Sequence, residues 1–135
     1  MFTKNKYTIY FYLILFFIVF LLLITANYSL SISYKEALNL YYNSSILSII
    51  TNSFTYIFGH NDLALRVPFI IFYTLSVILM FLITKDYFKY EKDRFISVLI
   101  FMSLPGVLSA SLLVNTAIIV TFFTLLYIYF YQKHK

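Results

Sequence analysis

Few side chains in this sequence could do chemistry, and they are widely spaced. The chain has two histidines, His60 and His134, and no cysteine. Metal binding and nucleophilic catalysis need clustered ligands or a base beside a nucleophile, and the two histidines are far apart along the chain. We therefore interpret His60 as a polar turn residue. The lack of cysteine excludes disulfides, thiol nucleophiles and thiolate metal sites.

Two pairs of charged residues are stronger candidates. Lys35 and Glu36 are adjacent, and Asp62 and Arg66 are four residues apart. Glu36 is either a residue favoured by the dipole at a helix N-terminus or a carboxylate available as a base or metal ligand. Arg66 is either the partner of Asp62 in a local i,i+4 pair or a contact for a phosphate group. The residue types alone leave both alternatives open.

The composition places these side chains in a membrane protein. Of the 135 residues, 62% are apolar and 11% are charged. This charged share is about half that of an ordinary soluble domain. A soluble fold of this size has too little interior for so much apolar surface, which excludes a soluble enzyme. The net charge of +5 does not indicate nucleic acid, because the basic residues stand at the ends of apolar runs.

The uncharged stretches predict four membrane-spanning helices, at about residues 7–27, 63–84, 95–111 and 115–131. The first stretch is longer than the apolar core of a signal peptide, so we interpret it as an uncleaved span. The last two share one uncharged window, from Phe95 to Gln132, which as a single helix would be about 57 Å long. We expect the chain to turn back near Asn115, and Pro105 to kink the third span. The prediction is an all-α membrane protein forming a single domain over residues 1–135.

The segment at about residues 34–58 differs from the spans. Its apolar residues recur at three- and four-residue steps, and Ser, Thr and Asn fill the positions between them. This amphipathic pattern favours a helical segment lying in the membrane interface between the first and second spans. The alternative is a poor transmembrane helix that faces other helices.

The distribution of basic residues predicts the orientation. Eight of the ten Lys and Arg residues stand on one side of the predicted spans, and only Lys35 and Arg66 fall on the other. Because cytoplasmic loops are enriched in Lys and Arg, we expect both termini in the cytoplasm and the amphipathic segment outside. The expected location is the inner, cytoplasmic membrane of a bacterium.

One block of residues carries a family resemblance. Residues 58–68 read FGHNDLALRVP, after a long first span and an outer segment that contains Glu36. This arrangement resembles the amino-terminal part of the GT-C-type glycosyltransferases, which use polyprenyl-phosphate sugars. They include the family-39 enzymes, the aminoarabinose transferases of lipid A and the protein mannosyltransferases. The similarity covers roughly residues 31–131, and in this family a Phe-Gly followed by an Arg-x-Pro typically opens the second span.

The resemblance assigns roles to three residues. It implies that Glu36 is the catalytic acid or metal contact, and that Arg66 and Lys35 bind the substrate. The family's first outer loop usually carries Asp-Glu, but here Lys35 replaces the first acid. The family also often has an Asp where the fourth span begins, and here Asn115 stands there. We therefore expect no glycosyl transfer by the isolated chain, because a neighbouring cation favours the ionised carboxylate and weakens it as a base.

The expected function is that of an amino-terminal portion, or short relative, of such an enzyme, working at the outer membrane face. The expected partners are the bilayer, a polyprenyl-phosphate-sugar donor and a membrane subunit encoded downstream. No cofactor is evident, and the resemblance leaves room for a divalent metal without a ligand set for one. The alternatives are a small four-span flippase-like transport protein for polyprenyl-linked sugars, and a non-catalytic membrane subunit or split-gene remnant.

Overall fold

The computed structural model describes residues 4–28 and 46–134, and these residues fold into helices joined by short turns, without strands. In chain order the helices are α1 (Lys4–Tyr28), α3 (Ile46–Phe58), α4 (Asp62–Tyr87), α5 (Glu91–Ser103), α6 (Pro105–Leu112) and α7 (Thr116–Lys133). The all-helical prediction is confirmed for this part of the chain. Residues 1–3, 29–45 and 135 lie outside it, and with them Lys35, Glu36 and the first part of the predicted amphipathic segment.

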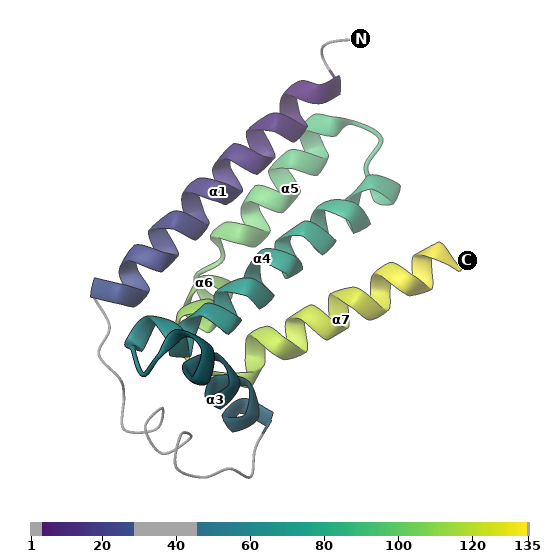
Figure 1. The fold of residues 1–135 in the computed structure, drawn as a ribbon. Helices are drawn as coiled ribbons and strands as arrows, with labels where there is room; N and C mark the ends of the chain where they lie inside the picture. Colours follow the sequence, from purple (N-terminus) through teal and green to yellow (C-terminus); the bar gives the residue numbers. More distant parts are fainter. Residues whose placement is uncertain (1–3, 29–45, 135) are drawn as a thin grey trace.

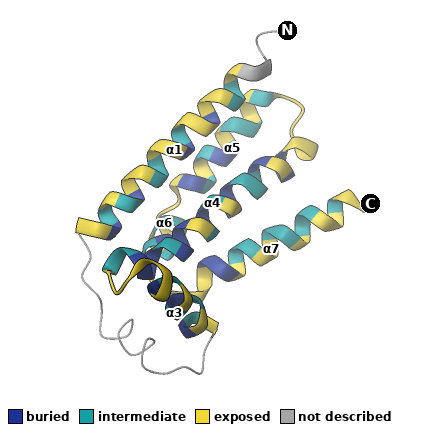
Figure 2. Ribbon diagram, viewed as in Figure 1, coloured by how far each residue is buried: buried dark blue, intermediate teal, exposed yellow. Residues whose placement is uncertain are grey.

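Helix α4 is the centre of the fold, because each of the other described helices contacts it. Half of its most apolar stretch is buried inside the protein, against 22% for α1 and 11% for α7. Figure 2 shows the same contrast, with dark blue positions concentrated on α4. The core consists of Phe11, Leu15, Leu22 and Ala26 from α1, Phe69, Ile70, Tyr73, Val77 and Phe81 from α4, Val98 and Met102 from α5, and Ile118 and Ile119 from α7.

Three of the described helices, α1, α4 and α7, are long and apolar enough to cross a membrane. The 26 residues of α4 extend about 39 Å at 1.5 Å per residue, more than the roughly 30 Å of a hydrocarbon core. The pair α5 and α6 meets the same criterion but is bent by 52° at a short break. The number of candidate spans is therefore three, or four if this pair is one span. Asn115, where we expected the chain to turn back, is the N-cap of α7.

The bend between α5 and α6 lies at Leu104, directly before Pro105. Proline has no backbone N–H to donate to the carbonyl of Phe101, and the Leu104 N–H donates to it instead, at 3.3 Å. The bend also separates the carbonyl of Met102 from its usual helical donor. The hydroxyl of Tyr73 on α4 donates to this carbonyl at 2.9 Å, and both residues are fully buried. The proline therefore bends this apolar stretch, and a side chain from the central helix donates to the buried carbonyl that the bend leaves without its helical donor.

The helices run between two ends of the molecule (Figure 1). One end, called here the α3 end, holds α3, α6, the last turn of α1 and the first turns of α4 and α7. The other end holds the first turn of α1 and the last turns of α4 and α7. We call it the basic end, because the exposed Lys85, Lys89, Lys92 and Lys133 lie there. The first and last described turns of the chain are therefore at the same end.

Helix α3 has an amphipathic pattern whose polar face is turned toward the protein. Ser48, Thr51 and Thr55 are buried, whereas Ile49 and Ile57 are exposed. The two threonine hydroxyls donate to backbone carbonyls within α3, so neither presents a free donor to its surroundings. With 13 residues, about 20 Å, α3 is too short to cross a hydrocarbon core.

Candidate functional site

Arg66, the predicted phosphate contact, is buried at the α3 end, with only 2% of the residue exposed. It stands in the second turn of α4, and its Nη1 donates to the backbone carbonyl of Ala26, in the last turn of α1, at 3.1 Å. Carbonyls at the C-terminus of a helix generally lack helical donors and carry partial negative charge, which favours a guanidinium. Arg66 therefore holds the end of α1 against the start of α4.

The residue types and spacing did not indicate this contact. They left Arg66 as either the local partner of Asp62 or a phosphate contact. Asp62 lies half-buried in the first turn of α4, where the helix dipole favours a carboxylate. The structure therefore gives Arg66 a positioning role between two helices, whether or not a phosphate also binds there.

The turn that brings Arg66 into place depends on a glycine. Gly59 has a φ of +85°, a left-handed backbone conformation that residues with a Cβ rarely adopt. Its carbonyl accepts a hydrogen bond from the Asn61 N–H at 3.0 Å, and Asn61 is the N-cap residue of α4. His60 is exposed in this turn, as a polar turn residue should be. The Phe-Gly part of the motif thus ends α3 and starts α4 at the point that lets Arg66 reach α1.

Glu36 and Lys35, the predicted catalytic and substrate-binding residues, lie outside the described residues. Their segment connects Tyr28, at the end of α1, to Ile46, at the start of α3. Both of these flanking residues are at the α3 end (Figure 1). The segment that carries Glu36 therefore leaves and rejoins the described fold at the end where Arg66 is buried.

Asn115 is also at the α3 end, and it has a structural task. Its side-chain oxygen accepts a hydrogen bond from the N–H of Ala117 at 2.9 Å, which caps the N-terminus of α7. Within residues 4–28 and 46–134, no group of three or more His, Cys, Asp or Glu side chains could hold a metal ion.

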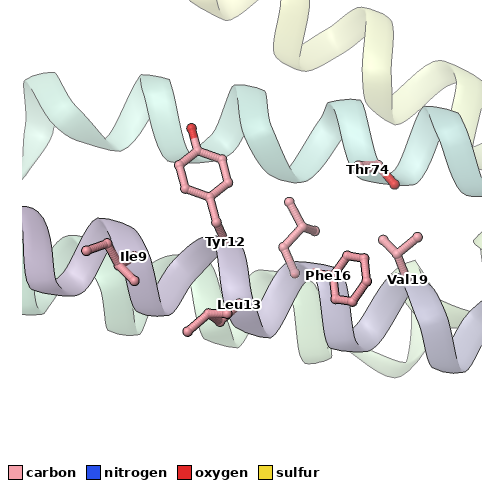
Figure 3. Close-up of a pocket in the computed structure, with 7 residues that line it drawn as sticks. Ile9, Tyr12, Leu13, Phe16, Val19 and Thr74 are labelled. Carbon is pink, nitrogen blue, oxygen red and sulfur yellow. The ribbon is translucent and has the colours of Figure 1, made fainter.

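An apolar groove of about 570 Å³ lies between α1 and α4. Figure 3 shows side chains of α1 on one side and Thr74 of α4 on the other. The lining residues are Ile9, Tyr12, Leu13, Leu15, Phe16, Val19 and Thr74. Val19 is seven residues before Ala26 in α1, so this end of the groove lies about 10 Å along the helix from the Arg66 contact. The groove is lined mainly by apolar side chains, and its Val19 end is the one nearer the α3 end.

Two structural features were not predicted from the sequence. Tyr73 donates to a carbonyl at the α5–α6 bend. The sequence features that could have indicated this are a single tyrosine in a mainly apolar stretch and a proline about thirty residues later, since a buried tyrosine hydroxyl usually has a hydrogen-bond partner. The favoured prediction for residues 34–58 was an interfacial segment, and it did not specify that the hydroxyl face of α3 is buried. The signal for this burial was the run of small hydroxyl residues at three- and four-residue spacing, which also suits close helix packing.

The family comparison agrees with the motif in residues 58–68. A family model described as dolichyl-phosphate-mannose-protein mannosyltransferase matches residues 45–134, which include α3 to α7. The resemblance stated from the sequence is thereby confirmed. No curated protein and no solved structure matches the chain.

Proposed function

Because the chain belongs to the dolichyl-phosphate-mannose-protein mannosyltransferase family, we propose that it forms the membrane-embedded part of a GT-C-type glycosyltransferase. The sugar donor is a polyprenyl-phosphate sugar, and the reaction takes place at the outer face of the cytoplasmic membrane. The observation that carries this proposal is the family match over residues 45–134, together with three long apolar helices.

In this proposal the α3 end faces outward and the basic end faces the cytoplasm. The support is the excess of Lys and Arg at the basic end, since cytoplasmic flanks of membrane spans are rich in these residues. Helix α3 then lies in the outer interface, with its exposed isoleucines toward lipid and its buried hydroxyl face toward the protein.

Cysteine labelling tests this orientation, because the chain has no native cysteine. We expect a Cys at position 45 to react with a membrane-impermeant maleimide in intact cells, and a Cys at position 89 to react only after permeabilisation. Both positions are in the chain outside the predicted spans. The reverse pattern would overturn the orientation and move the proposed site to the cytoplasmic face.

The donor's phosphate binds at the α3 end in this proposal. Arg66 and Lys35 contribute positive charge to it, and Glu36 serves as the catalytic carboxylate. The support for Arg66 is its location, since it stands between the ends of two helices at the end where the segment with Glu36 is attached. Charge-assisted hydrogen bonds from arginine are well suited to phosphate.

The polyprenyl chain lies in the groove between α1 and α4. The groove is apolar and ends about 10 Å along α1 from the Arg66 contact, so a chain placed in it can present its phosphate toward the α3 end. A substitution that fills the groove, Leu13→Trp, should weaken donor binding. The matched control is Leu21→Trp, on the same helix at an exposed position that does not line the groove. Equal effects of the two substitutions would exclude the groove.

Donor binding and sugar transfer can be measured separately, with the purified chain reconstituted in lipid and a polyprenyl-phosphate sugar added. We expect the donor to bind and no sugar to be transferred, since Lys35 stands beside Glu36 and Asn115 takes the place of a second acid. Binding of the polyprenyl-phosphate sugar that weakens in Arg66→Ala, while binding of the uncharged polyprenol does not, supports the phosphate contact. Turnover abolished by Glu36→Gln would show that a single acid suffices and that the chain is catalytic by itself.

A second candidate is a non-catalytic membrane subunit that presents the donor to a partner chain. The observation that favours it is the amide of Asn115, which is used to cap α7 at the place where the family often has an Asp. The discriminating experiment is co-expression with the product of the reading frame immediately downstream. Transfer that requires both chains supports the subunit, and transfer by this chain alone excludes it.

A further inference from the structure

The basic end carries a polar pocket that the proposed glycosyltransferase function does not use. The pocket has a volume of about 240 Å³ and lies between the last turns of α4 and α7. Its lining residues are Leu82, Lys85 and Asp86 from α4, and Tyr129 and Lys133 from α7. Three larger grooves among the described residues are lined by uncharged and mainly apolar side chains, so this pocket differs from them in carrying charges of both signs.

The lining is arranged in two layers. Leu82 is about one helical turn before Lys85 and Asp86 in α4, and Tyr129 is about one turn before Lys133 in α7. Both helices are candidate membrane spans that end within a few residues of these charges. The charged layer therefore lies at the boundary between hydrocarbon and headgroups, and the apolar and aromatic layer lies on its hydrocarbon side, where interfacial tyrosines are common.

We infer that this pocket binds the headgroup of phosphatidylethanolamine. The phosphate lies between the ammonium groups of Lys85 and Lys133, and the lipid's ammonium group donates hydrogen bonds to the carboxylate of Asp86. The acyl chains continue past Leu82 into the hydrocarbon. Pockets with basic residues between membrane helices are a recurrent way of holding phospholipid headgroups.

The charge balance favours this lipid over a purely anionic one. Two lysines face one aspartate, and both helices end here with partial negative charge at their C-termini. The pocket therefore offers both signs of charge close together, as a zwitterion requires. A phosphatidylglycerol headgroup would place the same phosphate between the two lysines, but it has hydroxyl groups and no ammonium group to pair with Asp86. A phosphatidylcholine headgroup has a cation but no N–H to donate to the carboxylate.

Native mass spectrometry of the purified full chain in detergent tests the inference, with phosphatidylethanolamine, phosphatidylcholine and phosphatidylglycerol of identical acyl chains as probes. We expect phosphatidylethanolamine to bind about tenfold more tightly than phosphatidylcholine, the value of one charge-assisted hydrogen bond. In the unaltered protein, monomethyl and dimethyl derivatives of phosphatidylethanolamine should bind progressively more weakly as N–H donors are lost. This series needs no substitution, so it does not depend on whether a variant folds.

Variants then assign the contacts. Asp86→Asn should reduce phosphatidylethanolamine binding to the phosphatidylcholine level, and the double variant Lys85→Gln, Lys133→Gln, which removes two such contacts, should weaken the binding of both lipids about a hundredfold. The matched control is Lys92→Gln, an exposed lysine of α5 that does not line the pocket. Equal binding of the three lipids, a phosphatidylglycerol preference that Asp86→Asn leaves intact, or an equal loss in Lys92→Gln would each overturn the inference.

Discussion

The two arginines of this chain each bind a backbone carbonyl, at opposite halves of the central helix. Arg66 of α4 donates to the carbonyl of Ala26 near the C-terminus of α1, and it is almost completely buried. Arg94 of α5 donates through Nε and Nη2 to the carbonyl of Phe81 in α4, at 2.9 and 2.6 Å. Its guanidinium also lies over the Phe81 ring, 3.6 Å from the centroid.

The two carbonyls differ in the hydrogen-bond donors that would remain if the arginine were removed. The carbonyl of Phe81 lies inside α4, and the Thr84 hydroxyl also donates to it at 3.1 Å, so Arg94 adds to a group that already has a partner. The carbonyl of Ala26 is in the last turn of α1, where helical donors run out. Arg94 therefore adds to an existing interaction near the basic end, whereas Arg66 connects two helices at the α3 end.

The largest expected effect is that of Arg66→Ala. The change removes a charge-assisted hydrogen bond in a buried position and separates α1 from α4, so we expect it to lower the free energy of unfolding by about 3 kcal/mol. The measurement is denaturation by SDS in mixed micelles, followed by circular dichroism. Arg66→Lys, which keeps the charge and one donor, should recover part of the loss. A smaller loss of unfolding free energy in Arg66→Ala than in Arg94→Ala would show that Arg94 is the more important structural contact.

Tyr73→Phe sharpens the comparison with a neutral donor. Tyr73 satisfies the Met102 carbonyl at the α5–α6 bend, a group that has lost its usual helical partner. Removing the hydroxyl leaves a buried acceptor, and we expect a loss of about 1.5 kcal/mol. Tyr127→Phe, at an exposed position on α7, is the control and should be nearly neutral. An equal effect of both changes would show that the bend does not depend on this hydroxyl.

Arg94→Ala should cost about 1 kcal/mol, because it removes a cation–π contact and hydrogen bonds to a carbonyl that keeps the Thr84 hydroxyl. The same SDS titration measures it. Arg94→Lys should retain the charge near the ring but lose the forked donation to one oxygen. A loss of 3 kcal/mol or more in Arg94→Ala, about that expected for Arg66→Ala, would mean that both arginines are equally structural.

The membrane class and the helical fold could be predicted from the sequence because they depend on the length of its uncharged, apolar stretches. The same signal marked the start of α7 at Asn115 and the bend at Pro105, since polar and proline residues interrupt apolar runs at few places. The direction of the α3 polar face could not be predicted. Hydroxyl side chains that donate to carbonyls of their own helix are compatible with water and with a protein interior alike, and only the folded structure decides between the two.

The candidate site was predictable only in part, for a related reason. The type and position of Arg66 indicated a phosphate contact or a local pair, because both are interactions that a sequence motif suggests. Its partner is a backbone carbonyl forty residues earlier, and backbone carbonyls have no sequence signature. The pocket at the basic end has the same origin, since Lys85 and Lys133 come together only when α4 and α7 end side by side.

The smallest expected effect concerns a helix end that is exposed to solvent. Asn115→Ala removes the side-chain acceptor for the Ala117 N–H, and we expect a loss of about 0.5 kcal/mol, because water can replace the cap at an exposed position. Asn115→Asp keeps the acceptor and adds a negative charge at the N-terminus of α7, so it should match or slightly exceed the unaltered protein in stability. SDS titration at two ionic strengths checks this, because a dipole effect weakens with salt and a hydrogen-bonded cap does not. If Asn115→Asp were instead destabilising by more than Asn115→Ala, the added charge would be meeting another negative group at the α3 end. The candidates at this end are Asp62, in the first turn of α4, and the proposed catalytic carboxylate of Glu36, so a destabilisation that persists when Asp62 is changed to Asn would place Glu36 near the start of α7.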